Sequence, residues 1–202
     1  SNLDCKIIIP ARYKSSRFEG KPLAPILGIP MIKRVWSQCI KAINEENVYV
    51  ATDSKRISDF CSNEGIRSIM TSKDCLTGTD RVFEASKKIN ADLYINVRGD
   101  EPIIDPSDIS RVITASEEYP NDIINAMSKI SEENDFRSPS VPKVICDTEK
   151  NLLFMSRAPI PTNKNNDFVS AYKQVCIYAF PKHALELFAS NTSKTPIESI
   201  ED

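Results

Sequence analysis

The chain has 202 residues, of which 26 are Lys or Arg and 28 are Asp or Glu, so its formal net charge is −2. Hydrophobic residues make up 41% and charged residues 27%, which is enough apolar side chain for a core and excludes a wholly disordered chain. No apolar run approaches the roughly 20 residues that span a bilayer, residues 1–4 lack the basic start of a signal peptide, and the balanced charge argues against nucleic-acid binding. We therefore expect a soluble, cytoplasmic protein that binds neither membranes nor nucleic acid.

In the first half of the chain, short apolar runs alternate with stretches whose apolar residues recur at helical spacing. The first run, residues 5–10 (CKIIIP), is continuous and rich in isoleucine, which is typical of a strand buried on both faces. We expect Ser107 to cap the last helix of this half. Alternation at this spacing predicts βαβ units and a mainly parallel sheet. The expected strands are residues 5–10, 48–52, 68–70 and 93–97, and the expected helices are 31–43, 57–63, 79–89 and 107–118.

The second half of the chain is richer in strand-like runs. Residues 134–142 and 158–167 contain many Pro, Ser and Asn residues, so we expect irregular loops there. Residues 196–202 have the pattern of a helix start without its end, and we interpret the chain as lacking a C-terminal part. The expected strands are residues 123–130, 142–146, 152–156 and 175–180, with a hairpin turn at 147–151.

The cysteines and the single histidine give no pattern typical of a metal site or a nucleophile. None of the six cysteines lies in a C-x-x-C pair, and none has zinc-site spacing with His183. We interpret them as reduced thiols that pack as small apolar residues. No nucleophile signature lies near His183, which argues against Ser-His-Asp and Cys-His mechanisms.

Residues 11–23 (ARYKSSRFEGKPL) form a cationic loop after the first predicted strand. Arg12, Lys14, Arg17 and Lys21 lie within ten positions of one another. Ligands of open α/β sheets bind outside the carboxyl ends of the strands, where this loop must lie. Four cations there would suit a triphosphate, and a solvated surface loop is the alternative interpretation. The segment contains neither a Walker A motif nor a dinucleotide fingerprint.

Residues 96–102 (NVRGDEP) follow another predicted strand at its carboxyl end. Mg²⁺ needs only one or two carboxylates beside phosphate oxygens and water, so Asp100 is a candidate metal ligand. A simple turn is the alternative interpretation. A cationic loop and an acidic strand end on one edge of a sheet are together what nucleotidyl transfer requires.

Six motifs occur in order along the chain: residues 9–13 (IPARY), 15–17 (SSR), 20–23 (GKPL), 51–53 (ATD), 77–81 (TGTDR) and 96–102 (NVRGDEP). With these motifs, the sequence from residue 6 to its end resembles the CMP-Kdo synthetases (3-deoxy-manno-octulosonate, or Kdo, cytidylyltransferases), within the CMP-sialic acid synthetase-like nucleotidyltransferases. The resemblance implies one domain over residues 1–202 with a Rossmann-like three-layer α/β fold and a mainly parallel sheet. Residues 1–130 would be the CTP-binding half, and residues 131–202 a smaller β-rich half for sugar binding and dimerisation.

The resemblance also implies the reaction and the residues that perform it. The enzyme would be Mg²⁺-dependent, and the anomeric hydroxyl of an acidic sugar would attack the α-phosphate of CTP and release pyrophosphate, for lipopolysaccharide or capsule synthesis. The active molecule would be a homodimer. The implied CTP-binding residues are Ala11, Arg12, Ser15, Arg17, Lys21, Gly78, Thr79 and Arg81. The implied catalytic residues are Arg12, Lys21 and Asp100, and Asp100 is also the implied metal ligand. The implied sugar-binding residues are Arg98, Arg157, Gln174 and Tyr178.

Four positions depart from the family pattern. Arg98 replaces the usual Gln, Gln174 and Cys176 replace His and Gly, and Glu19 replaces Pro. The first three lie near the implied sugar pocket, and Arg98 adds a fixed charge there. The sugar substrate could therefore be Kdo, a close analogue of Kdo, or a sialic or other nonulosonic acid. The second metal-binding Asp of the family lies downstream of residue 202. A CTP-binding module with incomplete metal ligation is therefore the alternative that is not an enzyme.

Overall fold

A computed structural model describes residues 3–14, 19–99 and 104–189, and the structural statements below concern these ranges. Within them the chain forms two compact units. The first unit runs to Ile124 and resumes at Cys176, and the second comprises Asn125–Val175. Strand β10 (Tyr172–Pro181) contributes residues to both units. No helix in the described ranges has the length and apolar character needed to cross a membrane.

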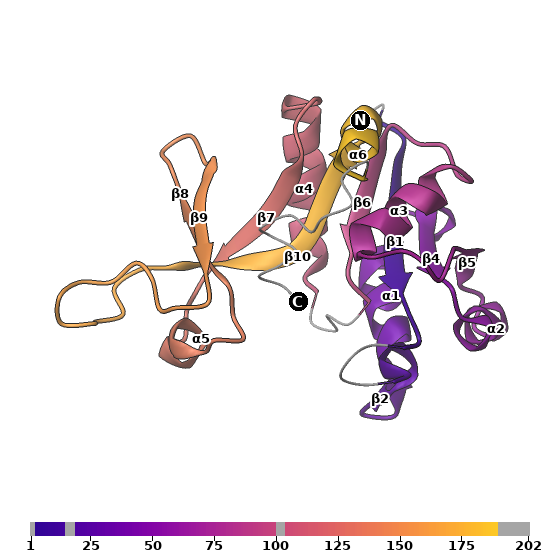
Figure 1. Ribbon diagram of the computed structural model, residues 1–202, viewed down its shortest axis with the longest axis horizontal. Helices are drawn as coiled ribbons and strands as arrows, with labels where there is room; N and C mark the ends of the chain where they lie inside the picture. Colours follow the sequence, from indigo (N-terminus) through magenta and orange to yellow (C-terminus); the bar gives the residue numbers. More distant parts are fainter. Residues whose placement is uncertain (1–2, 15–18, 100–103, 190–202) are drawn as a thin grey trace. The chain divides into compact units, whose positions relative to one another are not determined.

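The first unit is built on a parallel sheet (Figure 1). Strand β1 (Cys5–Ala11) lies between β4 (Val48–Thr52) and β6 (Leu93–Val97). On its other side, β4 pairs with β5 (Arg67–Met70). All three pairings are parallel. Residues 177–181 of β10 pair with β6 in the antiparallel direction. The predicted α/β fold with a parallel sheet is confirmed, and β10 makes that sheet a mixed one.

Helices cover both faces of this sheet. A Cβ atom on Gly99 would meet Ile9 of β1 and Ile32 of α1, whereas one on Gly78 of α3 would meet Pro10. Because successive side chains of a strand point to opposite faces, α1 and α3 lie on opposite sides of β1. Helix α4 packs beside α1, and α6 packs beside α3. The helices of this unit are α1 (Met31–Ala42), α2 (Lys55–Asn63), α3 (Gly78–Ser86), α4 (Pro106–Glu118) and α6 (Lys182–Ala189).

The second unit is mainly antiparallel. Strands β8 and β9 form the predicted hairpin, and residues 172–173 of β10 pair with β8 on its other side. Strand β7 also pairs with β10. A small core forms where buried Phe136 stacks on Phe168, with ring centroids 4.9 Å apart. The elements of this unit are β7 (Ile124–Lys129), α5 (Glu133–Arg137), β8 (Lys143–Cys146) and β9 (Leu152–Ser156).

Some local predictions were wrong. The expected loop at residues 134–142 begins as helix α5, because Phe136 packs into the core of the second unit. The cap of α4 is Asp105 rather than Ser107: its side chain accepts a hydrogen bond from the Ser107 backbone N–H at 2.9 Å. The expected helix start at residues 196–202 lies outside the described ranges. Five elements were not predicted: the helix α6 and the short elements η1 (Lys21–Leu23), β2 (Pro25–Ile26), β3 (Ile29–Pro30) and η2 (Glu45–Asn47).

Candidate functional site

The carboxyl ends of the parallel strands form one edge of the first unit. Ala11, the last residue of β1, is level with Thr52, the last residue of β4. Strand β6 ends at Val97, beside β1. The cationic loop and the Arg98-Gly99 pair therefore leave the sheet at the same edge, as the sequence predicted. Asp53, which follows β4, lies at this edge too.

The loop that follows β1 is closed at its base by Tyr13 and Gly20. The Gly20 backbone N–H donates to the Tyr13 carbonyl oxygen at 2.6 Å. Gly20 has φ +75°, and a Cβ on it would lie 3.1 Å from the Tyr13 ring. Arg56 of α2 donates to the Tyr13 hydroxyl at 2.7 Å and lies over the ring, 4.9 Å from its centroid. This closure brings the chain back beside Tyr13, so η1 starts near the end of β1.

Closure of the loop positions two of the predicted phosphate-binding cations. Arg12 directly precedes Tyr13 and is exposed, while Lys21 directly follows Gly20 and is half-buried. The two residues thus leave the two ends of one closed loop, at the edge where the parallel strands end. Ser15 and Arg17, predicted to bind the same ligand, lie outside the described residues.

The N-terminus of α3 approaches β1 closely. The Thr77 hydroxyl caps the helix by accepting a hydrogen bond from the Asp80 N–H at 3.1 Å. Gly78 lies against Pro10, and a Cβ on it would be 3.4 Å from the Pro10 ring. Thr79 is buried. A helix N-terminus carries unsatisfied N–H groups and partial positive charge, so this end of α3 suits an anionic or polar ligand.

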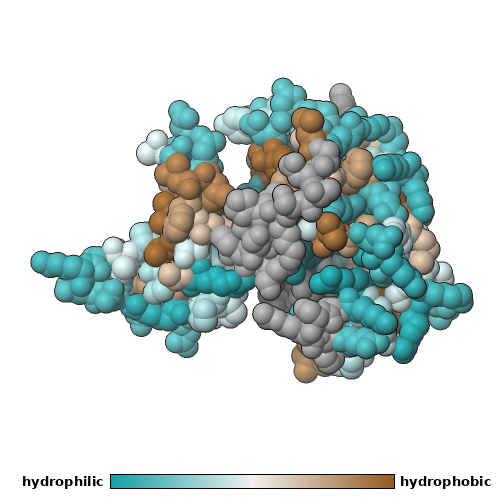
Figure 2. All heavy atoms as spheres, in the orientation of Figure 1, coloured by the Kyte–Doolittle hydropathy of each residue, from teal (hydrophilic) through white to brown (hydrophobic). Residues whose placement is uncertain are grey.

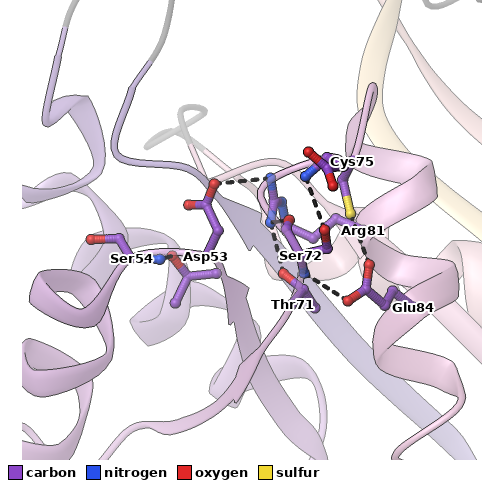
Figure 3. A network of polar contacts seen from close by, with 9 residues as sticks. Asp53, Ser54, Thr71, Ser72, Cys75, Arg81 and Glu84 are labelled. Atoms are coloured by element: carbon purple, nitrogen blue, oxygen red, sulfur yellow. Dashed lines mark hydrogen bonds and ion pairs between the residues drawn. The ribbon is translucent and has the colours of Figure 1, made fainter.

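Arg81, a predicted CTP-binding residue, is buried inside a polar network (Figure 3). Its guanidinium donates to the Thr71 hydroxyl at 2.7 Å and to the Ser72 carbonyl oxygen at 3.0 Å. It also pairs with the Asp53 carboxylate at 3.7 Å. These contacts join α3 to the ends of β4 and β5, so Arg81 holds the edge of the sheet together.

Glu84 extends this network by one turn of α3 (Figure 3). Its carboxylate accepts hydrogen bonds from the Ser72 backbone N–H at 2.6 Å and from the Cys75 thiol at 3.2 Å. Thr71, Ser72 and Glu84 were not predicted as site residues. Two features of the sequence could have indicated them. Glu84 follows Arg81 by three residues, so both lie on one face of a helix, and Thr71 and Ser72 directly follow a strand.

Asn96 is a buried polar residue of β6 that the sequence analysis left without a role. It is 4% exposed, and its Oδ1 atom has no hydrogen-bond partner among the described residues. Its Nδ2 atom would lie 3.8 Å from a Cβ on Gly78, so the side chain lies below the start of α3. Buried oxygen atoms without a hydrogen-bond partner are rare in folded proteins. The Asn96 Oδ1 atom can therefore accept a hydrogen bond from a group outside the described residues.

The predicted metal ligand cannot be placed. Gly99 fits tightly under β1, since a Cβ on it would lie 3.0 Å from the Pro10 carbonyl oxygen. Asp100, which follows it, lies outside the described residues. In the part of the chain that the structure describes, no three His, Cys, Asp or Glu side chains are grouped so that they could hold a metal ion.

The four predicted sugar-binding residues are divided between the two units. Arg98 and Tyr178 belong to the first unit, where Tyr178 of β10 is paired with Asn96 two residues before Arg98. Arg157 and Gln174 belong to the second unit. There, both contact the short segment after α5: Arg157 donates to the Pro139 carbonyl oxygen and the Gln174 N–H donates to the Pro142 carbonyl oxygen, each at 3.0 Å.

Four of the six thiols are chemically unsuited to nucleophilic catalysis. Burial raises the pKa of Cys39 to about 12 and the pKa values of Cys5 and Cys61 to about 11. Burial and the hydrogen bond to Glu84 raise the pKa of Cys75 to about 12. Because the thiolate is the reactive form, these groups are inert near neutral pH.

Comparisons with known proteins match nearly the whole chain to one family. Residues 6–202 match the sequence profile of the family described as cytidylyltransferase. The 8-amino-3,8-dideoxy-manno-octulosonate cytidylyltransferase of Shewanella piezotolerans is 38% identical over 205 residues, covering 99% of this chain and 82% of that protein. The protein of the same name from Shewanella frigidimarina is 38% identical over 201 residues, covering 97% and 80%.

Solved structures show the same relationship. The structure of a CMP:2-keto-3-deoxy-manno-octonic acid synthetase complexed with CTP superposes with a TM-score of 0.85 at 35% identity, covering 98% of this chain and 82% of that one. A cytidylyltransferase from Leptospira borgpetersenii shares the fold, with a TM-score of 0.62 at 18% identity over 98% of this chain and 68% of that one. With matches that span nearly its whole length, the chain belongs to the cytidylyltransferase family.

Proposed function

We propose that this protein transfers the CMP group of CTP to the anomeric hydroxyl of a Kdo-type sugar acid, either Kdo or its 8-amino analogue. The hydroxyl oxygen forms a bond to the α-phosphorus, the bond from that phosphorus to pyrophosphate breaks, and the hydroxyl proton passes to solvent. The names of the Shewanella relatives and of the CTP-bound structure support this substrate pair. Because CTP is a cytoplasmic nucleotide, the proposal places the reaction in the cytoplasm.

The closed first loop is the observation that carries the proposal. It sets Arg12 and Lys21 at the carboxyl edge of a parallel sheet, where the charges of a triphosphate would be balanced. We assign both to the CTP phosphates, together with Ser15 and Arg17 of the same loop. Gly78 and Thr79 at the start of α3, and Ala11 at the end of β1, would line the nucleoside side of the site.

Arg81 takes a different role in this proposal from the one that the resemblance implied. Its guanidinium is buried and bound to Thr71, Ser72 and Asp53. We therefore assign it to support the edge on which CTP binds, and its effect on CTP binding would be indirect.

The proposed reaction uses Mg²⁺ as its cofactor. Asp100 would hold the ion together with phosphate oxygens of CTP, in line with the ligands that Mg²⁺ prefers. When bound, the ion would neutralise phosphate charge and lower the pKa of a coordinated hydroxyl. Chelation of divalent cations with EDTA should abolish pyrophosphate release, and added Mg²⁺ should restore it.

We propose that the sugar acid is bound by Arg98, Arg157, Gln174 and Tyr178. Arginine matches the geometry of a carboxylate with two parallel hydrogen bonds, so Arg157 is our candidate for the acid group. Arg98 adds a second cation, which would favour one acid over another. Because the 8-amino group carries a positive charge when protonated, a contact with Arg98 would favour Kdo over its 8-amino analogue.

The direct test measures pyrophosphate release by the purified protein with CTP and Mg²⁺. The acceptors are Kdo, 8-amino-Kdo, a sialic acid and no sugar. We expect release with Kdo or 8-amino-Kdo and none without sugar. Release with the sialic acid alone would replace our substrate class, and binding of CTP without release for any acceptor would favour a binding module.

The assignment of Lys21 is tested by Lys21→Ala. Loss of a charge-assisted contact to the phosphates should lower turnover by about 100-fold. Lys41→Ala is the matched control, because Lys41 is an exposed residue in the last turn of α1 and donates to Gln38 of the same helix at 2.7 Å. An equal rate for both variants would remove Lys21 from the site.

We further propose that the protein is a homodimer and that strand β9 contributes to the interface. Leu152, Leu153 and Phe154 are 42%, 65% and 57% exposed, and β9 pairs only with β8 in the described sheet. Figure 2 shows this apolar surface over the β8–β9 hairpin. Exposed apolar edge strands are a liability for a monomer and are typical of an interface.

A further inference from the structure

Lys143, the first residue of β8, is a buried cation to which the proposed mechanism gives no role. It is 0% exposed. Burial of an ammonium group is costly unless it is hydrogen-bonded, and an apolar residue would fill the same space without that cost. The presence of lysine here therefore calls for a reason beyond packing.

Three backbone carbonyl oxygens surround the Lys143 ammonium. Nζ donates to the oxygens of Ser138 at 2.6 Å, Val141 at 2.7 Å and Arg157 at 2.9 Å. An ammonium group has three N–H donors, so this arrangement satisfies the charged form. The three acceptors come from two separate segments, residues 138–142 (here the 138–142 loop) and the residue after β9.

The hydrogen bond from Lys143 to the Arg157 carbonyl oxygen lies one residue beyond the end of the backbone pairing between β8 and β9. Strands β8 and β9 begin their pairing at Lys143 and Ser156, and β9 ends at Ser156. Arg157 therefore lies just beyond the last backbone pair of the hairpin. The Lys143 side chain binds the Arg157 carbonyl oxygen, and the Arg157 guanidinium binds the Pro139 carbonyl oxygen.

The 138–142 loop thus connects both predicted sugar-binding residues of the second unit. Arg157 donates to Pro139 and the Gln174 N–H donates to Pro142. The Val141 N–H donates back to Ser138, whose carbonyl oxygen also accepts from Lys143. Removal of the Lys143 ammonium would take a donor from the Ser138, Val141 and Arg157 carbonyl oxygens and would remove the link that Lys143 makes between this loop and Arg157.

The charges near Lys143 agree with an anionic ligand in this unit. Burial, followed by the nearby Arg157 guanidinium, lowers the pKa of Lys143 from its ordinary value, while Asp135 opposes that change. Two cations therefore repel each other across the 138–142 loop. A carboxylate bound by Arg157 would relieve that repulsion.

We propose that Lys143 is a positioning residue: by binding the 138–142 loop and the Arg157 carbonyl oxygen, it holds the Arg157 guanidinium in place for the carboxylate of the sugar acid. This inference rests on the function proposed above. It adds a residue that does not touch substrate but acts through one that does.

The test compares Lys143→Met with wild type in the pyrophosphate assay. Methionine is unbranched like lysine but one heavy atom shorter, so it fills most of the same space with an apolar chain and removes the donors. The KM for the best sugar acid should rise by about tenfold, because a small displacement of a binding group is costly, while the KM for CTP stays within about twofold. Lys164→Met is the matched control, since Lys164 is an exposed residue of the same unit, and both of its KM values should equal those of wild type.

A double-mutant cycle with Arg157→Gln distinguishes positioning from general stabilisation. If Lys143 acts through Arg157, Lys143→Met should add little to the sugar KM of Arg157→Gln. Independent, additive effects, or equal rises in the KM for CTP and for sugar, would overturn the proposal. Circular dichroism and thermal unfolding verify that each variant is folded, and Lys143→Arg replaces Lys143→Met if the latter does not fold. The bulkier planar guanidinium keeps the charge but does not reproduce the three-carbonyl geometry, so the same split between KM values is expected.

The wild-type assay separates this inference from the proposed function. A wild-type protein that releases no pyrophosphate with any acceptor would overturn the proposed function, and the role of Lys143 with it. An active wild type, with an unchanged sugar KM in the folded variant, would overturn the role of Lys143 alone.

Discussion

At the scale of single residues, Gly20 decides the shape of the phosphate loop. Its φ of +75° is a left-handed conformation that side-chain-bearing residues seldom adopt, and a Cβ here would lie 3.1 Å from the Tyr13 ring, closer than ordinary van der Waals contact. Tyr13 is held in turn by Arg56 of α2. The closure that positions Arg12 and Lys21 therefore depends on the absence of one methyl group.

Gly20→Ala should weaken CTP binding as well as stability. The left-handed conformation costs alanine about 1–2 kcal/mol, and the contact with Tyr13 adds displacement of the ring. We expect the KM for CTP to rise several-fold and thermal unfolding to occur at a lower temperature. Pyrophosphate-release kinetics and a thermal melt measure the two effects.

Gly28→Ala provides the control for that experiment. Gly28 has φ +82°, in the turn between β2 and β3, with open space where its Cβ would lie. It carries the same backbone strain without the Tyr13 contact, so stability should fall and the KM for CTP should not change. Equal KM values for the two variants would show that the contact of Gly20 with Tyr13 does not matter for CTP.

At the scale of elements, Arg81 joins three parts of the chain that the sequence keeps apart. It lies on α3 and binds Asp53 after β4, and Thr71 and Ser72 after β5. With five donors in a planar fork, arginine can satisfy several acceptors at once. One buried side chain therefore links α3 to the carboxyl ends of both β4 and β5.

Arg81→Met should lower the free energy of unfolding by about 3 kcal/mol, because it leaves buried acceptors and the Asp53 charge without a partner. Arg81→Lys keeps the charge but not the fork, and should fall between wild type and Arg81→Met. Urea denaturation measures both. Arg111→Met is the control: Arg111 is 62% exposed and pairs with Asp108 on the surface of α4, so its loss should cost about 0.5 kcal/mol or less. Similar losses at the two arginines would contradict the role assigned to Arg81.

At the scale of the whole molecule, the proposed dimer depends on the apolar edge of the second unit. Strand β9 exposes three successive apolar side chains, so both of its faces carry apolar surface. A partner that covers this surface would remove it from water and would also cover the free edge of the strand.

Leu153→Glu combined with Phe154→Glu should convert the dimer to a monomer, because two charges would be buried at the interface without partners. Light scattering after size-exclusion chromatography gives the molar mass of each protein. Leu187→Glu serves as the control, since Leu187 is 72% exposed on α6, in the other unit. A wild-type protein that is monomeric at assay concentration would refute the dimer itself. A double variant that remains dimeric would move the interface away from β9.

The sequence by itself determined the parallel strands of the first unit, its helices α1 to α4 and the edge at which its site would lie. Continuous apolar runs, helical spacing and turn residues are local signals, and βαβ alternation turns them into a parallel sheet whose strand ends meet at one edge. The cationic loop and the motif at the end of β6 could therefore be assigned to that edge before any contact was known. In the second unit the strands and the hairpin also followed from local signals, but α5 did not, because it forms where Phe136 reaches a core built from distant residues.

Only the tertiary structure decided which polar residues are buried and what they bind. Arg81 was expected to bind CTP and Lys143 had no predicted role, yet each cation is buried and enclosed by acceptors from other segments. Asn96 was visible in a motif, but its unsatisfied oxygen was not. The antiparallel pairing of β10 with β6 likewise joins strands far apart in the chain. Burial and hydrogen-bond satisfaction depend on neighbours that folding brings together, and a one-dimensional pattern does not contain them.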